Sequence, residues 1–266
     1  MSFPLALPQP LSSPAQPSPA TTRPGFTPET RRLLARLPGE RGLWVMQAAR
    51  EETQATRPAP SPYPSGGATQ AARLAPPAAG LAHYFLLGAL LRGQRALFLD
   101  AANGFNPHRL AEMMRRLGRE PEELLARVRL SRAFTCFQLA ELVERVPAEA
   151  RRWSARCVFL TGVPEIFDDE ELQAAEARRV FARALEGMRR WRASERDLQL
   201  STLVFTSVFT PLRPQPSGLR RWLGTQLERA ADGVFRFEET PAGLAVRGGE
   251  KFPALCAPSA ASASLR

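Results

Sequence analysis

One acidic residue stands where a ligand-binding group is expected in many folds. Asp100 directly follows a short apolar run typical of a buried strand, Ala96 to Leu99, and Pro107 opens a helix after the next loop. Ligands of open α/β sheets bind at the carboxyl ends of the strands, so Asp100 could hold a cation or a ribose. The alternative, which we favour, is that its carboxylate caps the loop or anchors Asn103.

The other chemically capable side chains form no recognisable motif. His83 and His108 are isolated, and His83 stands in an apolar helix, where a hydrogen-bonded core role is expected. The acids at residues 168–171 could bind a metal, but acids are also ordinary in the first turn of a helix. We expect no metal site and no catalytic triad. The cysteines are widely spaced, as in reduced, partly buried thiols: Cys136, Cys157 and Cys256.

Composition favours one domain and a polyanionic partner. The chain has 266 residues, 44% of them hydrophobic, which is enough for a sizeable core. Its net charge of +10 favours nucleic acid, although acids and bases are mixed along most helices and a GC-rich genome also enriches arginine. No apolar run approaches the roughly 20 residues of a membrane span. The proline-broken N-terminus is unlike a secretory signal, so we expect a cytoplasmic protein.

The chain divides into five segments. We expect a disordered Pro/Ser-rich tail over residues 1–26 and a short helical element over residues 27–50, which Thr27 caps. A flexible linker, the core domain and a disordered tail follow at residues 51–72, 73–252 and 253–266.

Apolar strands alternate with amphipathic helices in the core. This order predicts an α/β fold with a mostly parallel central sheet, helices on both faces and a C-terminal β-hairpin. The main helices are expected over residues 79–92, 107–117, 135–146, 168–191 and 217–230. The strands are expected over residues 96–99, 128–134, 156–162 and 200–208, with the hairpin turning at residues 241–243.

The segment from residue 98 to residue 110 carries a family resemblance. It keeps an acid, an aromatic ring, a proline, an arginine and a leucine at a characteristic spacing: Asp100, Phe105, Pro107, Arg109 and Leu110. In this spacing, and in the order of elements over residues 73–250, the chain resembles the RecA/RadA recombinase family. The resemblance implies a RecA-like fold of the P-loop NTPase type. The chain departs from the family pattern at Ala101, Ala102 and Asn103.

The resemblance also implies where a nucleotide would bind, and the residues there lack the groups that bind phosphate and activate water. The phosphate loop would end at Gly80, where Leu81 and Ala82 replace the lysine and the Ser/Thr. Ala102 replaces the glutamate that activates water, and Thr161 replaces the aspartate of the second acidic strand. We therefore expect a degenerate nucleotide site, no cofactor and no ATPase activity.

The triplet Arg-Arg-Trp occurs at residues 151–153, 189–191 and 220–222. Arginine on phosphate with tryptophan stacked on a base is a common way to hold a single strand. The alternative is that each tryptophan anchors a helix end, and Trp191 falls on a buried stripe. The third triplet lies where the family carries a DNA-facing loop and helix. The candidates for nucleic-acid binding are Arg213, Arg220, Arg221 and Trp222.

Together these features predict a catalytically inactive RecA-like paralogue. It would act in DNA recombination or repair as an accessory protein that binds DNA, a recombinase or another repair protein. Phe26, Leu33 or Leu34 could dock on the partner. Two alternatives stay open: an ATPase with a remodelled nucleotide site, and a partner-binding subunit of a damage-response complex without DNA contact.

Overall fold

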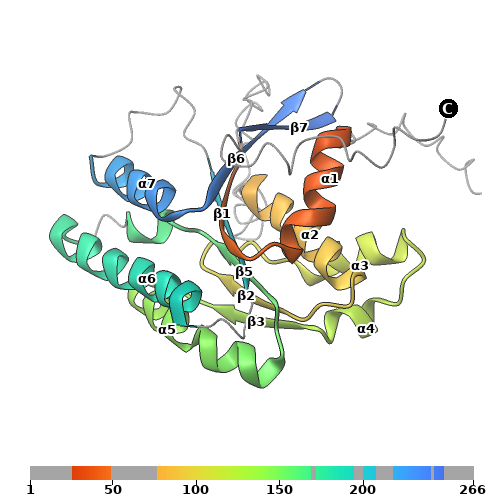
Figure 1. Ribbon diagram of the computed structural model, residues 1–266, viewed down its shortest axis with the longest axis horizontal. Coiled ribbons are helices and arrows are strands. Elements are labelled where there is room, and N and C mark those ends of the chain that lie inside the picture. The colour runs from red at the N-terminus through yellow and green to blue at the C-terminus, as the bar shows by residue number, and fades with distance from the viewer. Residues whose placement is uncertain are drawn as a thin grey trace, which may run out of the picture.

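The protein is a layered α/β structure with helices on both faces of one sheet (Figure 1). The computed structural model describes residues 26–48, 77–168, 172–194, 200–207, 218–240 and 243–248. The described strands lie in the spatial order β3 (Val128–Arg132), β2 (Ala96–Asp100), β4 (Cys157–Thr161), β5 (Ser201–Ser207), β1 (Gly42–Ala48), β6 (Gly233–Thr240) and β7 (Gly243–Gly248). All neighbours are parallel except β6 and β7, so the predicted fold class is confirmed.

The helices divide into two sets, one for each face. On one face lie α5 (Cys136–Trp153), α6 (Ala174–Ser194) and α7 (Gly218–Ala230), and on the other α1 (Pro28–Arg36), α2 (Pro77–Leu91), α3 (Pro107–Arg115) and α4 (Pro121–Leu125). Side chains of a strand alternate between the faces. In β2, Leu97 and Leu99 accordingly join the core under α5 and α6, and Phe98 joins the core under α2.

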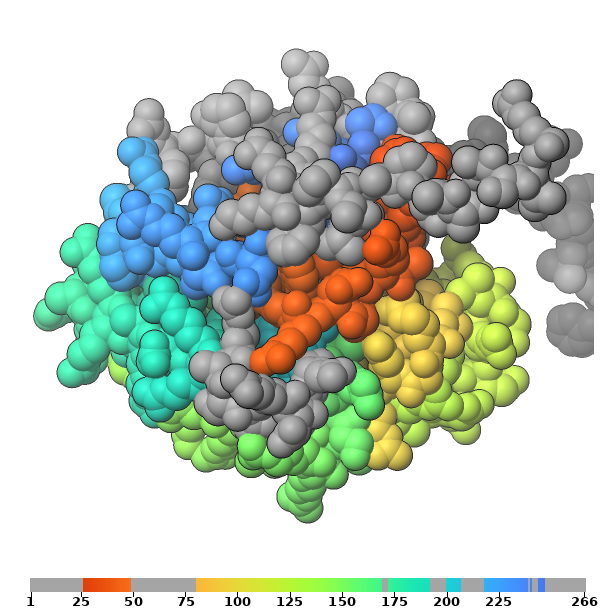
Figure 2. All heavy atoms as spheres, viewed as in Figure 1, coloured from red at the N-terminus to blue at the C-terminus, as the bar shows by residue number. Residues whose placement is uncertain are grey.

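The expectation that a helix continues through residues 42–50 is wrong for residues 42–48, which form β1. This strand pairs in parallel with both β5 and β6, and six of its seven residues are buried. A short apolar run buried on both faces has the same pattern in a strand and in a core helix, so periodicity could not separate them. The segment from residue 26 to residue 48 is therefore part of the core, and Figure 2 shows it, in red, packed against the rest of the protein.

Helix α1 is fixed to the same core. The Thr27 hydroxyl caps it at the Thr30 amide, as predicted, and the Thr30 hydroxyl donates to the carbonyl oxygen of Leu244 in β7 at 2.8 Å. The ring of Phe26 lies 4.6 Å from that of Tyr84 in α2. Leu33 is fully buried, so its expected role in docking a partner is wrong.

Helix α6 begins later than predicted, at Ala174. Asp168 precedes it outside the helix, and residues 169–171 lie outside the described residues, so the expected acidic first turn is not observed. Trp191 is buried, as its place on the apolar stripe indicated. No helix in the described part of the chain is long and apolar enough to span a bilayer.

Candidate functional site

Asp100 ends β2 as a fully buried loop cap. Its Oδ1 accepts hydrogen bonds from the Gly104 amide at 3.0 Å and from the Thr161 hydroxyl at 2.8 Å. Its Oδ2 accepts from the Phe105 amide at 3.0 Å, and the Arg132 guanidinium lies 3.8 Å away. The favoured interpretation of Asp100 as a loop cap is confirmed, with the Gly104 and Phe105 amides as its partners.

A second buried side chain holds the same loop. The Nε2 atom of His83 in α2 accepts a hydrogen bond from the Asn106 amide at 3.0 Å, and its ring stacks on Phe105. Asp100 and His83 thus satisfy three consecutive amides, those of residues 104–106. The Asn106 side chain then caps α3 at the Arg109 amide. The expectation of a hydrogen-bonded core histidine is confirmed, and these motif residues serve to fix the entry to α3.

The loops after β2 and β4 touch through their main chains. Gly162 has φ +79°, and a Cβ atom there would lie 2.5 Å from the Ala102 nitrogen and 2.6 Å from the Ala101 carbonyl carbon. The Ala101 amide also donates to the Thr161 carbonyl oxygen at 3.0 Å. Main-chain atoms therefore fill the space between these strand ends. Gly162 was the signal for this contact in the sequence, but reasoning from the sequence missed its importance.

The residues expected to mark the phosphate loop are in α2. Gly80 lies in its first turn, with the Arg109 guanidinium against it. Leu81 and Ala82 are buried in the core below α2 and present no polar group. The connection from β1 to α2, residues 49–76, lies outside the described residues. No group of three or more His, Cys, Asp or Glu residues in the described ranges is arranged to hold a metal ion.

Cys157 is a buried, hydrogen-bonded thiol. Its Sγ donates towards the Gln94 Oε1 at 2.9 Å and the Pro38 carbonyl oxygen at 3.1 Å. Burial raises the pKa of this thiol to about 12, against which the positive charges of Arg92 and Arg156 act weakly. The thiol is therefore neutral at physiological pH and is no nucleophile. Cys136 is also buried and free of disulfides, whereas Cys256 lies outside the described residues.

The third Arg-Arg-Trp triplet lies on α7, where Arg220 and Trp222 contact neighbouring elements. Arg220 lies 3.7 Å from Asp168, and the Trp222 ring packs edge-on against Phe181. The Arg178 guanidinium covers Trp222 at 5.5 Å. Arg221 is exposed, and Arg213 lies outside the described residues. Nucleic-acid binding by these residues stays a prediction.

Strand β3 is an edge of the sheet, and no described strand pairs with its outer side. The Ala96 amide bonds to the Arg127 carbonyl oxygen, and the Ala133 amide bonds to the Asp100 carbonyl oxygen. Backbone groups of a strand point alternately to its two sides, so these two bonds fix which residues face outward. The outward backbone groups are those of Val128, Leu130 and Arg132.

Exposed apolar side chains accompany this edge. Leu130 is 37% exposed, Phe134 71% and Phe137 44%. Between the sheet and α5, on the face towards which Arg129 and Ser131 point, lies a cavity of about 180 Å³. Its floor is apolar, and its rim carries Arg129, Ser131, Arg145 and Glu149. Leu130, the partner of Phe98, points to the opposite face of the sheet. We call the edge of β3, the three apolar side chains and this cavity the edge surface. The apolar floor residues are Leu97, Leu99, Leu142 and Val146.

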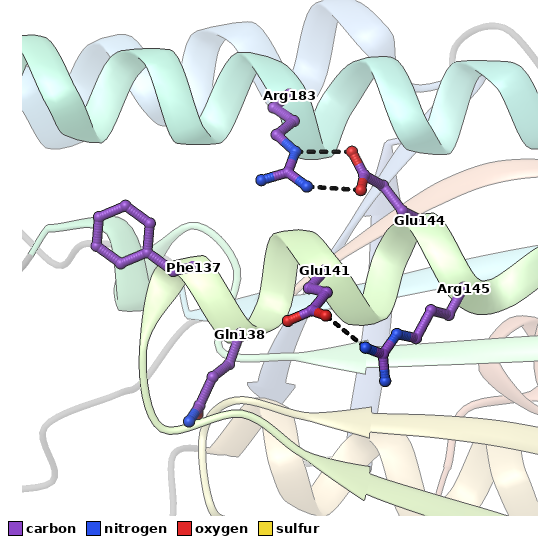
Figure 3. A pocket seen from close by; sticks show the side chains of 6 residues that line it. All are labelled: Phe137, Gln138, Glu141, Glu144, Arg145 and Arg183. Carbon is purple, nitrogen blue, oxygen red and sulfur yellow. Dashed lines mark hydrogen bonds and ion pairs between the residues drawn. The ribbon is translucent and has the colours of Figure 1, made fainter.

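The charged side chains next to the edge surface are paired within the protein (Figure 3). Glu144 of α5 accepts two hydrogen bonds from Arg183 of α6, at 2.7 and 2.6 Å, and this contact lowers the pKa of Glu144. Arg145 pairs with Glu141. Phe137 points away from both pairs, so an uncharged aromatic ring stands at the start of α5.

Comparisons with known proteins support the fold and nothing finer. No protein-family model matches the sequence, and no curated protein matches it. Among solved structures, the chain is similar to one titled "Crystal structure of the RadB recombinase", with a TM-score of 0.50 and 18% sequence identity. The match covers 77% of this chain and 77% of that one. The architecture built above from its strands and helices is a RecA-like fold.

Proposed function

We propose that this chain is a RecA-like accessory protein of DNA recombination or repair, without ATPase activity, which binds a recombinase through the edge surface. A single observation carries the proposal: the carboxyl ends of the strands are closed, whereas the outer side of β3 is open. At the carboxyl edge, Asp100 is saturated with hydrogen bonds and Gly162 contacts the neighbouring loop. At the side of the sheet, β3 offers backbone groups with which no described strand pairs, next to an apolar cavity.

The proposed lack of ATPase activity is supported by what stands at the expected positions. Leu81 and Ala82 are core residues, and Ala102 has no group that could orient water. Thr161, in the place of the family's aspartate, gives its hydroxyl to Asp100. Phosphoryl transfer needs a cation, a positively charged group on the phosphates and a positioned water, because catalysis there is almost wholly electrostatic and positional. These four residues supply none of the three.

The occupant that suits the edge surface is an extended segment with one large apolar side chain. An exposed strand edge binds such a segment by continuing the sheet, and pockets beside the edge select its side chains. A dry cavity of about 150 Å³ is large enough for a benzene molecule, so the 180 Å³ cavity suits one aromatic or large aliphatic side chain. We assign the segment to a recombinase because the RecA-like fold links the chain to that class of protein.

The purified full-length chain is expected to neither hydrolyse ATP nor bind it measurably. Phosphate release and calorimetric titration with Mg·ATP both test this, with an active RecA-type recombinase as the positive control. Contaminating ATPases are a common source of weak turnover, so the activity profile is compared with the protein profile across a sizing column. Turnover that follows the protein peak would make the chain an enzyme and overturn this part of the proposal.

Charging the strand edge is expected to weaken recombinase binding. In Leu130→Lys, the lysine stands on the outer strand where a charge discourages edge pairing, and the fold loses only a partly exposed side chain. The affinity for the purified recombinase of the same organism should fall at least about tenfold, as for a residue at the centre of an interface. Leu117→Lys is the matched control, because Leu117 is 54% exposed and follows α3, outside the edge surface.

Calorimetric titration or a biosensor measures this affinity, and thermal unfolding checks that both variants fold. Retained binding by Leu130→Lys, or equal loss in Leu117→Lys, would remove the edge surface from the proposal. A native chain that self-associates, and loses this property in Leu130→Lys, would assign the edge to a second copy and contradict recombinase binding there. Sedimentation velocity across a concentration series distinguishes that outcome.

A further inference from the structure

The amino edge of the sheet carries an arginine in front of each of three neighbouring strands. Arg127, Arg95 and Arg156 directly precede β3, β2 and β4. Main-chain bonds hold these positions side by side, from the Arg156 amide to the Arg95 carbonyl oxygen and from the Ala96 amide to the Arg127 carbonyl oxygen, at 3.1 and 3.0 Å. Neighbouring strands lie about 4.8 Å apart, so the three side chains leave the sheet close together.

Trp153, the last residue of α5, gathers further arginines at this edge. The guanidinium carbons of Arg95 and Arg129 lie 5.2 and 5.7 Å from the centre of its ring, within the range of cation–π attraction. Arg95 also donates to the Trp153 carbonyl oxygen at 3.3 Å. Arg151 and Arg152 precede Trp153 in the same helical turn and are exposed. We call Arg95, Arg129, Arg151, Arg152 and Arg156 the amino-edge cluster.

The cluster has a surplus of positive charge. In α3, α5 and α6, arginines pair with glutamates one turn away, as in Arg116–Glu112, Arg145–Glu141 and Arg190–Glu186. On the last two turns of α5 and the three strands below, Glu149 is the acid near the cluster, and it is held by Arg129 at 3.1 Å. Arg152 and Arg156 are exposed and form no ion pair with any described residue.

Local structure stabilises this concentration of charge. The C-terminus of α5 carries the negative end of the helix dipole, which favours cations there. Ser154 ends the helix in the left-handed conformation, with φ +52°, and the chain turns directly into β4. Arg156 is thereby brought back beside Arg95. Planar guanidinium groups bind phosphate in a bidentate manner, so several of them in one place suit a chain of phosphates.

We propose that the amino-edge cluster binds the phosphate backbone of DNA. The binding is independent of base sequence, because the guanidiniums of Arg95 and Arg129 already occupy the surroundings of Trp153 and its indole is not offered to a base. Trp153 acts as a positioning residue that holds two guanidiniums in place. The inference does not depend on recombinase binding. Arg129 borders both surfaces, but Arg152 and Arg156, which the test replaces, belong to the amino-edge cluster alone.

Fluorescence anisotropy with the full-length chain tests the cluster. The probes are a fluorescein-labelled 20-nucleotide single strand of mixed sequence and its duplex, titrated between 50 and 200 mM salt. The test variant is the double substitution Arg152→Gln/Arg156→Gln. Its matched control is Arg179→Gln/Arg190→Gln on α6, which lowers the net charge by the same amount and removes arginines of similar exposure.

The test variant should bind at least about tenfold more weakly at the lowest salt concentration. Each lost phosphate contact lowers the slope of log affinity against log salt by about 0.7 for a single strand and about 0.9 for a duplex. The loss of two contacts should therefore lower the slope by about 1.4 or about 1.8. The control should stay within about twofold of the native chain, because its arginines are paired with Glu176 and Glu186 on α6.

Several outcomes would overturn the proposal. Absence of binding to both probes at 50 mM salt would exclude a DNA surface. An equal loss in the control would show that net charge alone governs binding. A clear preference between two probes of different base sequence would contradict recognition through phosphates. Tighter binding to vesicles rich in phosphatidylserine, lost in the same test variant, would assign the cluster to a membrane surface. Tighter binding to RNA of the same sequence would assign it to RNA.

Discussion

Replacing Gly162 by alanine is expected to lower the free energy of unfolding by about 3 kcal/mol or more. A left-handed conformation costs a residue with a Cβ atom about 1–2 kcal/mol. At φ +79°, Gly162 has this conformation, and its new methyl group would also stand 2.5 Å from the Ala102 nitrogen. Main-chain atoms cannot move aside as a flexible side chain can, so the loop after β2 must shift and strain its hydrogen bonds to Asp100.

The chain contains a matched control in Gly118. It also has a positive φ, +64°, but a Cβ atom there meets nothing within 4 Å. Gly118→Ala should therefore cost about 1 kcal/mol, the conformational part alone. Urea unfolding followed by circular dichroism measures both variants. Equal losses would mean that the loops after β2 and β4 are not in close contact, and the case for a closed carboxyl edge would lose its geometric support.

Much of the fold could be predicted because its signals are local. The apolar run before Asp100 and the prolines that open α3 and α4 mark their elements within a few residues. Strand β1 could not be predicted, since its run Leu43 to Met46 has no polar alternation when both faces are buried. Only its two partner strands, more than 150 residues later in the chain, identify it as a strand.

The role of a site residue was predictable where its partners are close to it in the sequence. Asp100 was expected to cap its loop, and the capped amides are four and five residues away. The contact of Gly162 with Ala102 joins segments 60 residues apart and depends on β4 lying beside β2. The amino-edge cluster depends on the same strand order. The Arg-Arg-Trp triplet at residues 151–153 is visible in the sequence, but its neighbours Arg95 and Arg129 are not.

Replacing Asp100 by asparagine is expected to lower the free energy of unfolding by about 2–4 kcal/mol. The volume stays nearly the same, but the amide nitrogen takes the place of one carboxylate oxygen. If it replaces Oδ2, the buried Phe105 amide faces another donor, and an unsatisfied buried group costs about 1–3 kcal/mol. The alternative orientation leaves Gly104 and Thr161 without their shared acceptor. The remaining bonds also lose the strength that ionisation gives them.

A double-mutant cycle with Thr161→Val distinguishes a network from independent contacts. The Thr161 hydroxyl donates to Asp100 at 2.8 Å, so the two substitutions remove one common interaction. Their effects should fall short of additivity by at least about 0.5 kcal/mol. Glu112→Gln is the surface control, because its ion pair with Arg116 is exposed and such pairs contribute about 0–1 kcal/mol. Additive losses would mean that Thr161 does not support Asp100.

The DNA affinity of Asp100→Asn, unlike its stability, is expected to stay unchanged. Asp100 lies at the carboxyl end of β2, and Arg95 precedes its amino end, so the loop cap and the amino-edge cluster are on opposite edges of the sheet. At a temperature where Asp100→Asn is folded, its DNA affinity should stay within about twofold of the native chain, although its stability is lower. A folded Asp100→Asn that no longer binds DNA would place the nucleic acid at the carboxyl edge, and Asp100 would then be a binding residue as well as a structural one.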